Sequence, residues 1–95
     1  MEKNDLYSKL IMVFGKENQV IVAVEELAEL QKELTKFLRK KLNRVNLSEE
    51  IADVEIMVEQ LKLMFNCGQQ VEDIKNYKLE RTARDILGVK NVAGK

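Results

Sequence analysis

The chain lacks histidine and proline and has one cysteine among its 95 residues. The absence of histidine excludes acid–base catalysis by imidazole, serine-type triads and the Glu-x-x-His ligation of di-iron bundles. Cys67 has no partner for an internal disulfide, and no zinc-type spacing occurs. Any chemistry must therefore rely on carboxylates, amines, guanidinium groups and a metal ion that prefers oxygen ligands.

Long hydrophobic runs, aromatic residues and net charge are also scarce. The longest apolar stretch is too short to span a bilayer, and the N-terminus lacks the apolar core of a signal peptide. Sixteen basic and sixteen acidic residues cancel to zero net charge, which gives no global attraction to nucleic acid or anionic membranes. We therefore expect a soluble, cytoplasmic protein that binds neither nucleic acid nor membranes.

The composition predicts an all-α fold, because proline is absent and Leu, Glu, Lys, Val and Ile are abundant. A hydrophobic content of 45% in so short a chain suggests one small domain, residues 1–88. Residues 89–95 carry little to bury and are expected to fray. The apolar periodicity predicts four helices with a break at 43–46, and the expected ranges are 5–14, 17–42, 47–66 and 70–87.

Local signals set these expected boundaries. Gly15 separates the first two helices. Asn46, with Glu49 three residues later, matches a capping box and is predicted to cap the third helix. Gly68 is expected to adopt a left-handed conformation at the end of that helix, and Gly88 to stop the fourth.

Two near-identical acidic motifs stand out, EELAE at 25–29 and EEIAD at 49–53. Each places one carboxylate three residues before another, Glu26 before Glu29 and Glu50 before Asp53. On a helix, both members of such a pair occupy neighbouring positions of one face. Because like charges at this spacing destabilise a helix, the repetition needs a physical reason.

Helical-wheel positions give the second motif more weight than the first. Glu26 lies at the edge of an apolar stripe on the second helix, and Gln19 lies two turns earlier on the same edge. That stripe comprises Val20, Ala23, Val24, Leu27, Leu30, Leu34, Phe37 and Leu38. Glu50 lies near the middle of the third helix's stripe and Asp53 lies on its border. A carboxylate in the middle of an apolar stripe is difficult to explain as a solvated surface group.

The third helix is apolar on two sides. Its main stripe comprises Ile51, Val54, Met57, Val58, Leu61, Met64 and Phe65, and its second strip comprises Ala52, Ile56 and Leu63. A helix of this kind is buried on both sides. In so small a chain, another subunit is expected to supply the second cover.

Two explanations account for the acidic pairs. Lys or Arg from the fourth helix could neutralise Glu50 and Asp53, which would be purely structural. Alternatively, they meet Glu26 and Glu29 across the helix pair, where only a cation makes four negative charges tolerable. Oxygen ligands without His or Cys favour Mg²⁺, with Mn²⁺ as a substitute, and Mg²⁺ commonly bridges to substrate phosphates. A nucleoside tri- or diphosphate is therefore a reasonable ligand.

The motifs resemble those of the MazG-like nucleoside triphosphate pyrophosphohydrolases, in the all-α NTP pyrophosphatase superfamily. The resemblance covers roughly residues 14–87 and rests on three segments, EELAEL at 25–30, EEIADV at 49–54 and YKLER at 77–81. It implies Mg²⁺ ligation by four carboxylates, Glu26, Glu29, Glu50 and Asp53. It also implies hydrolysis of a (d)NTP to the monophosphate and pyrophosphate, and assembly into dimers or dimer-of-dimers tetramers.

The remaining candidate site residues follow from this activity. Glu25 or Glu29 would take the proton of the attacking water, since no histidine exists. Lys36 lies on the same side of its helix as these two glutamates, so it is a phosphate candidate, although it could simply complement the helix dipole. Lys78 and Arg81 are further phosphate candidates by resemblance, against an alternative as surface salt-bridge partners.

The base-binding residues and the alternative functions are less constrained. Phe14 and Gln19 are hypotheses for base or ribose contacts. The chain is a single minimal module with a compact N-terminal segment, so its base preference stays open. The expected biological role of such a hydrolase is house-cleaning of the nucleotide pool. Two alternatives remain, a helical module for oligomerisation or partner binding, and a nucleotide sensor without turnover. A partner-binding module explains the two-sided third helix but leaves Glu50 unexplained.

Overall fold

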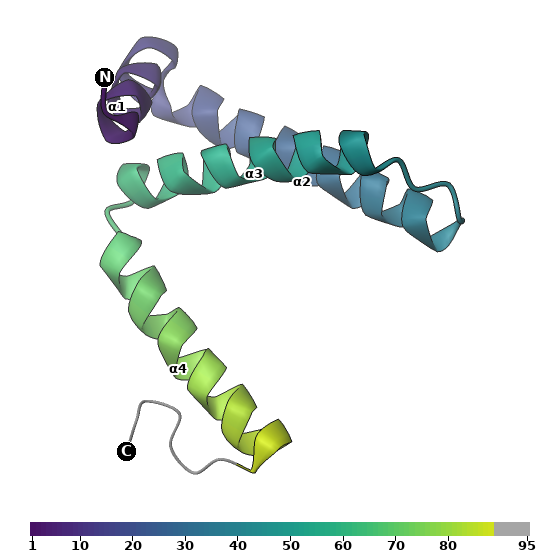
Figure 1. The fold of residues 1–95 in the computed structure, drawn as a ribbon. Coiled ribbons are helices and arrows are strands. Elements are labelled where there is room, and N and C mark those ends of the chain that lie inside the picture. The colour runs from purple at the N-terminus through teal and green to yellow at the C-terminus, as the bar shows by residue number, and fades with distance from the viewer. Residues whose placement is uncertain (89–95) are drawn as a thin grey trace.

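A computed structural model describes residues 1–88, and all regular elements in that range are α-helices (Figure 1). Their bounds are Lys3–Phe14 for α1, Lys16–Leu38 for α2, Arg44–Met64 for α3 and Gly68–Leu87 for α4. The predicted all-α fold with four helices is therefore confirmed. The expected fraying of residues 89–95 lies outside the described residues. No helix within 1–88 combines the length and the apolarity needed to cross a bilayer.

Helix α2 ends four residues before the expected position, because Lys40 adopts a left-handed φ of 60°. The Lys40 N–H donates to the Phe37 carbonyl at 3.0 Å, and the Lys41 N–H donates to the Lys36 carbonyl at 2.8 Å. This pair of bonds is the Schellman motif, in which the left-handed residue is usually glycine. With lysine in that place, composition gave no sign of the helix end.

The predicted ends of the loop between α3 and α4 are also wrong in detail. Asn66, not Gly68, adopts the left-handed conformation after α3, with a φ of 49°. The Cys67 N–H then donates to the Lys62 carbonyl at 3.1 Å, which closes a second Schellman motif. Gly68 is instead the first residue of α4. The predicted stop at Gly88 is confirmed, since this residue has a left-handed φ of 68°.

The predicted capping box at the start of α3 is likewise wrong. Asn43 is the N-cap, and its side-chain oxygen accepts a hydrogen bond from the Asn46 N–H at 3.0 Å. An asparagine at either position can cap a helix. The earlier one is used, so α3 begins at Arg44, three residues before the expected start.

Helices α2 and α3 form an antiparallel pair, and α1 packs across the end of the pair that lies away from the α2–α3 loop (Figure 1). A φ of 90° at Gly15, accessible to glycine, permits the sharp turn between α1 and α2. The Tyr7 hydroxyl donates a hydrogen bond to Glu59, which joins α1 to α3. Among the described helices α4 contacts only α3, and it runs away from the pair.

The resulting core is small and the shape is open. Within residues 1–88, the buried apolar side chains are those of Tyr7, Ala23 and Met57. The radius of gyration is 17.0 Å, against about 12 Å for a compact domain of this length. The apolar stripe of α2 is only partly covered within one chain, since Phe37 and Leu38 remain 60% and 77% exposed. The reason is that α3 covers one side of α2 and α4 does not fold back over the other.

Candidate metal centre

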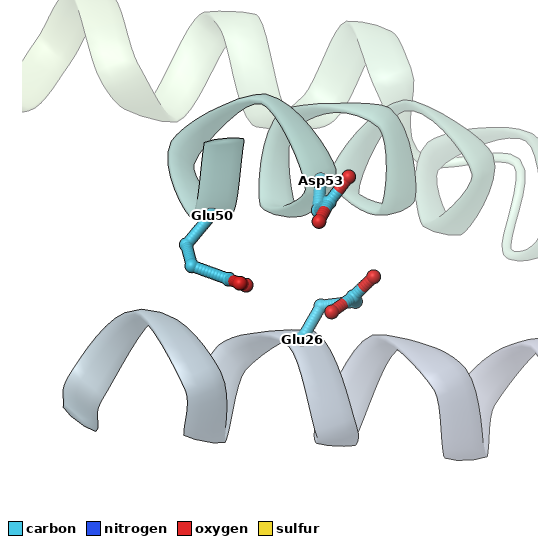
Figure 2. A group of neighbouring side chains, drawn as sticks. All are labelled: Glu26, Glu50 and Asp53. Carbon is cyan, nitrogen blue, oxygen red and sulfur yellow. The ribbon is translucent and has the colours of Figure 1, made fainter. Parts of the chain in front are cut away.

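Three of the predicted carboxylates converge between α2 and α3. Glu26 points from α2 toward Glu50 and Asp53 on α3 (Figure 2). One oxygen from each carboxylate lies within 4.8 Å of the other two. Because Mg²⁺–oxygen bonds of about 2.1 Å place ligand oxygens about 3–4 Å apart, the three side chains surround a space suited to a divalent cation.

The register of the two helices produces this convergence. Two turns before Glu26 on α2 lies Gln19, and two turns after Asp53 on α3 lies Gln60. Gln19 Nε2 donates to Gln60 Oε1 at 2.8 Å, and both side chains are buried. The same antiparallel register therefore pairs the two amides at one level and the carboxylates at the next.

The pKa of two of these carboxyls is raised. Partial burial is the main cause for Glu26, and the negative charges of Asp53, Glu29 and Glu25 add to it. Partial burial is also the main cause of the raised pKa of Glu50, followed by the charges of Glu26 and Asp53. Oxygen Oε2 of Glu50 is buried without a hydrogen-bond partner. A group in this state requires a proton or a cation for its stabilisation.

Glu29 and Glu25 lie at the rim of the cluster. Both side chains are exposed, and neither belongs to the group of three converging carboxylates. The charge of Glu29 nevertheless contributes to the raised pKa of both Glu26 and Glu50. The role of Glu29 as a ligand, and of either residue as a proton acceptor, stays a prediction.

A further carboxylate, that of Glu33, was not among the site residues predicted from the sequence. It is only 6% exposed, and its Oε2 accepts a hydrogen bond from Lys36 Nζ at 2.8 Å. Its Oε1 is buried without a partner, and its charge contributes to the raised pKa of Glu50. The spacing held a signal for it, since Glu33 follows Glu26 by two helical turns on the same face.

The predicted phosphate contacts are distributed unevenly around the centre. Lys36 is in an ion pair with Glu33 on the same helix, with its Nζ 2.8 Å from Oε2 of Glu33. Lys78 and Arg81 are exposed on α4, where Arg81 lies over the Tyr77 ring at 5.6 Å. Because α4 meets α3 at the end away from Glu50, a single chain does not bring these two residues to the carboxylates.

The two candidates for base or ribose contacts occupy different environments. Phe14 is the last residue of α1 and is 54% exposed. Gln19 is 7% exposed, with its amide nitrogen committed to Gln60. A contact from Gln19 to a nucleotide would therefore require this hydrogen bond to open.

Comparisons with models of protein families, with curated proteins and with solved structures found no match. The chemistry of the centre must therefore be inferred from its own residues. Carboxylate oxygens without His or Cys favour Mg²⁺ or Mn²⁺, and an unpartnered buried oxygen on Glu50 fits a cation ligand.

Proposed function

We propose that this protein is a Mg²⁺-dependent nucleoside triphosphate pyrophosphohydrolase that converts a (d)NTP to the monophosphate and pyrophosphate. The observation that carries the proposal is the convergence of Glu26, Glu50 and Asp53, which each bring one oxygen within 4.8 Å of the other two. The resemblance of both acidic motifs to those of MazG-like pyrophosphohydrolases supports the reaction type. Mn²⁺ is the expected substitute cation.

The residues of the centre have distinct roles in this proposal. Glu26, Glu50 and Asp53 hold the cation, and Glu29 at the rim completes the set when the nucleotide enters. A bound Mg²⁺ supplies charge stabilisation at the phosphates and lowers the pKa of a bound water. The exposed carboxylate of Glu25 or Glu29 accepts the proton that the attacking water loses.

We propose further that the protein acts as a homo-oligomer, a dimer or a dimer of dimers. The chain exposes 7647 Å², against about 5,600 Å² expected for a folded monomer of its mass. Large apolar side chains from both α2 and α3 contribute to this surface, among them Phe37 and Ile56. Lys78 and Arg81 on α4 lie away from the carboxylates of their own chain, so their proposed phosphate role requires a second copy.

The exposed apolar faces also favour a second candidate, a helical module that binds a partner protein without catalysis. In that case the carboxylates would have no substrate, and the chain would not turn over nucleotides. A nucleotide sensor would bind a nucleotide with Mg²⁺ but would not release pyrophosphate.

Pyrophosphate release from a panel of canonical, deoxy and damaged nucleotides, with Mg²⁺ and with EDTA, tests the proposal. We expect at least one substrate to be hydrolysed with Mg²⁺ only. Glu50→Gln should lower the rate by at least about 10–100-fold. Mutation of residues that only hydrogen-bond to a metal ligand typically costs about 10–100-fold in activity, and Glu50 is itself a proposed ligand. Glu55→Gln, at an exposed acid on the same helix, is the matched control. Absence of turnover across the panel, or full activity in Glu50→Gln, contradicts the proposal.

A further inference from the structure

Charge is unevenly distributed along this chain, although its total is zero. Residues 34–48 contain five basic side chains and no acidic one, so the rest of the chain carries five more acidic than basic residues. The five are Lys36, Arg39, Lys40, Lys41 and Arg44. Zero net charge gives the chain as a whole no attraction to an anionic surface. A local cluster of one sign still acts within a Debye length, about 8 Å at physiological ionic strength.

The fold gathers these residues at one end of the molecule. They belong to the last turns of α2, the α2–α3 loop and the start of α3, at the end of the helix pair opposite α1 (Figure 1). We refer to residues 34–48 as the basic tip. Leu38, the last residue of α2, lies about 18 Å along the helix axis from Glu26. The loop of the basic tip is therefore separate from the carboxylate centre.

Most of the cations at the basic tip are free to meet a ligand. Lys36 pairs with Glu33. The other four side chains are exposed and form no ion pair within residues 1–88. Because the tip contains no carboxylate, its cations require counter-charges from outside this segment.

Large apolar side chains are exposed among these cations. Leu38 is 77% exposed, Val45 is 66% exposed and Leu42, in the loop between them, is 42% exposed. A surface hollow at this end is lined by Phe37, Leu38, Lys40 and Leu42. Removing such apolar surface from water is favourable. An occupant that suits the basic tip therefore offers negative charge and apolar cover together.

We propose that the basic tip is a docking surface for an anionic phospholipid bilayer. The headgroup layer attracts clustered Lys and Arg side chains, and the acyl boundary beneath it covers Leu38, Leu42 and Val45. Nucleic acid also offers phosphates, but it binds by aromatic stacking and polar contacts and gives aliphatic side chains no cover. The contact is peripheral, since no helix within residues 1–88 could cross a bilayer. This inference does not depend on the metal centre or on the proposed reaction.

Co-sedimentation of the full chain with lipid vesicles tests the proposal. We expect binding to vesicles of phosphatidylcholine and phosphatidylserine in equal parts, and little binding to phosphatidylcholine alone. Added NaCl should weaken the binding, because salt screens the attraction between the cations and the headgroups. Absence of binding to the charged vesicles, or equal binding to both kinds, overturns the proposal without the use of any variant.

Charge reversal assigns the binding to this end of the molecule. Lys41→Glu combined with Arg44→Glu should lower binding to the charged vesicles at least about tenfold. Lys3→Glu combined with Lys9→Glu makes the same change of net charge at exposed positions of α1, at the opposite end, and should bind like the wild type. Circular dichroism checks the fold of both variants. An equal loss in the two variants, or no loss in the first, overturns the assignment to the basic tip.

A variant that keeps every charge separates a bilayer from other occupants. Leu38→Ser combined with Val45→Ser should weaken binding to the charged vesicles and leave any binding to heparin or single-stranded DNA unchanged. Unchanged vesicle binding in this variant would assign the tip to polyanions in general and overturn the proposal. A lower mass of this variant in light scattering would show that a second copy covers the apolar side chains, which also overturns it.

Discussion

Gln19 and Gln60 join α2 to α3 by a buried hydrogen bond of 2.8 Å, two helical turns from the carboxylates of Glu26 and Asp53. The two amides are 7% and 2% exposed, so water does not compete for the bond. A single polar pair inside an apolar helix interface disfavours other registers, because any shift leaves its members unpaired. The pair therefore fixes the level at which the carboxylates meet.

Removing one member of this pair should cost more stability than removing both. In Gln60→Leu the buried amide of Gln19 loses its partner, and we expect the free energy of unfolding to fall by about 1–3 kcal/mol. Gln19→Leu combined with Gln60→Leu should recover most of that loss, because no buried polar group remains unpaired. Urea unfolding followed by circular dichroism measures both variants. Equal destabilisation in the single and double variants would show that the unpaired amide of Gln19 is not the cause of the lost stability.

In the absence of metal, Glu50→Gln should raise the melting temperature at pH 7. The pKa of Glu50 is raised in the folded protein from its ordinary value of 4.5. The native state therefore holds its proton more tightly than the unfolded state, and stability falls as pH rises from about 4.5 through the native pKa. The glutamine variant carries no such charge and escapes this loss.

The difference between Glu50→Gln and the wild type should accordingly grow from pH 4.5 to pH 7. Thermal melts in EDTA across this range measure it, with Glu55→Gln as the control for a change of net charge alone. A difference that stays constant with pH would argue against a raised pKa at this position.

Divalent cations should reverse this order of stability. Mg²⁺ or Mn²⁺ that binds only the folded protein raises its free energy of unfolding, by about 2.7 kcal/mol at a concentration of 100 Kd. We expect a clear rise in the wild-type melting temperature with millimolar MgCl₂ or MnCl₂ and little rise in Glu50→Gln. NaCl at the same ionic strength, without divalent cations, controls for charge screening. An equal rise in both proteins would place the bound ions elsewhere.

The exposed apolar strip of α3 predicts self-association. Ile56 lies on this strip and is 43% exposed in the single chain. Ile56→Glu places a charge there, which should reduce the mass in solution to that of a monomer because an unpaired charge is costly in an apolar interface. Size-exclusion chromatography with light scattering gives the mass, and Glu55→Gln should keep the wild-type value. A monomeric wild type would contradict the proposed assembly.

Sequence patterns located much of the candidate site. The spacing within each acidic motif and the helical period placed Glu26, Glu50 and Asp53 on facing surfaces, and the structure brings their oxygens together. Glu33 was missed because it belongs to neither motif, although the same period puts it two turns beyond Glu26. Its burial depends on its packing beside α3, which no local pattern reports.

The helix boundaries show a similar division. Proline-free, helix-favouring composition was sufficient for four helices, and Gly88 ended the last one as expected. Lys40 and Asn66 took the left-handed positions at the ends of α2 and α3. These positions require a backbone conformation that glycine adopts most readily, but a closing pair of backbone hydrogen bonds can hold other residues there.

The sequence by itself determined the all-α class and the carboxylate composition of the candidate centre, because periodicity and residue type act locally and histidine and cysteine ligand sets are absent. Only the tertiary structure decided which acids meet. The α2–α3 register joined three carboxylates, left Glu29 at the rim and buried an oxygen of Glu33. It also decided that α4 leaves the helix pair, so that Lys78 and Arg81 do not reach the centre within one chain. Register and helix direction depend on contacts between distant segments, and such contacts are not encoded in any single stretch of the chain.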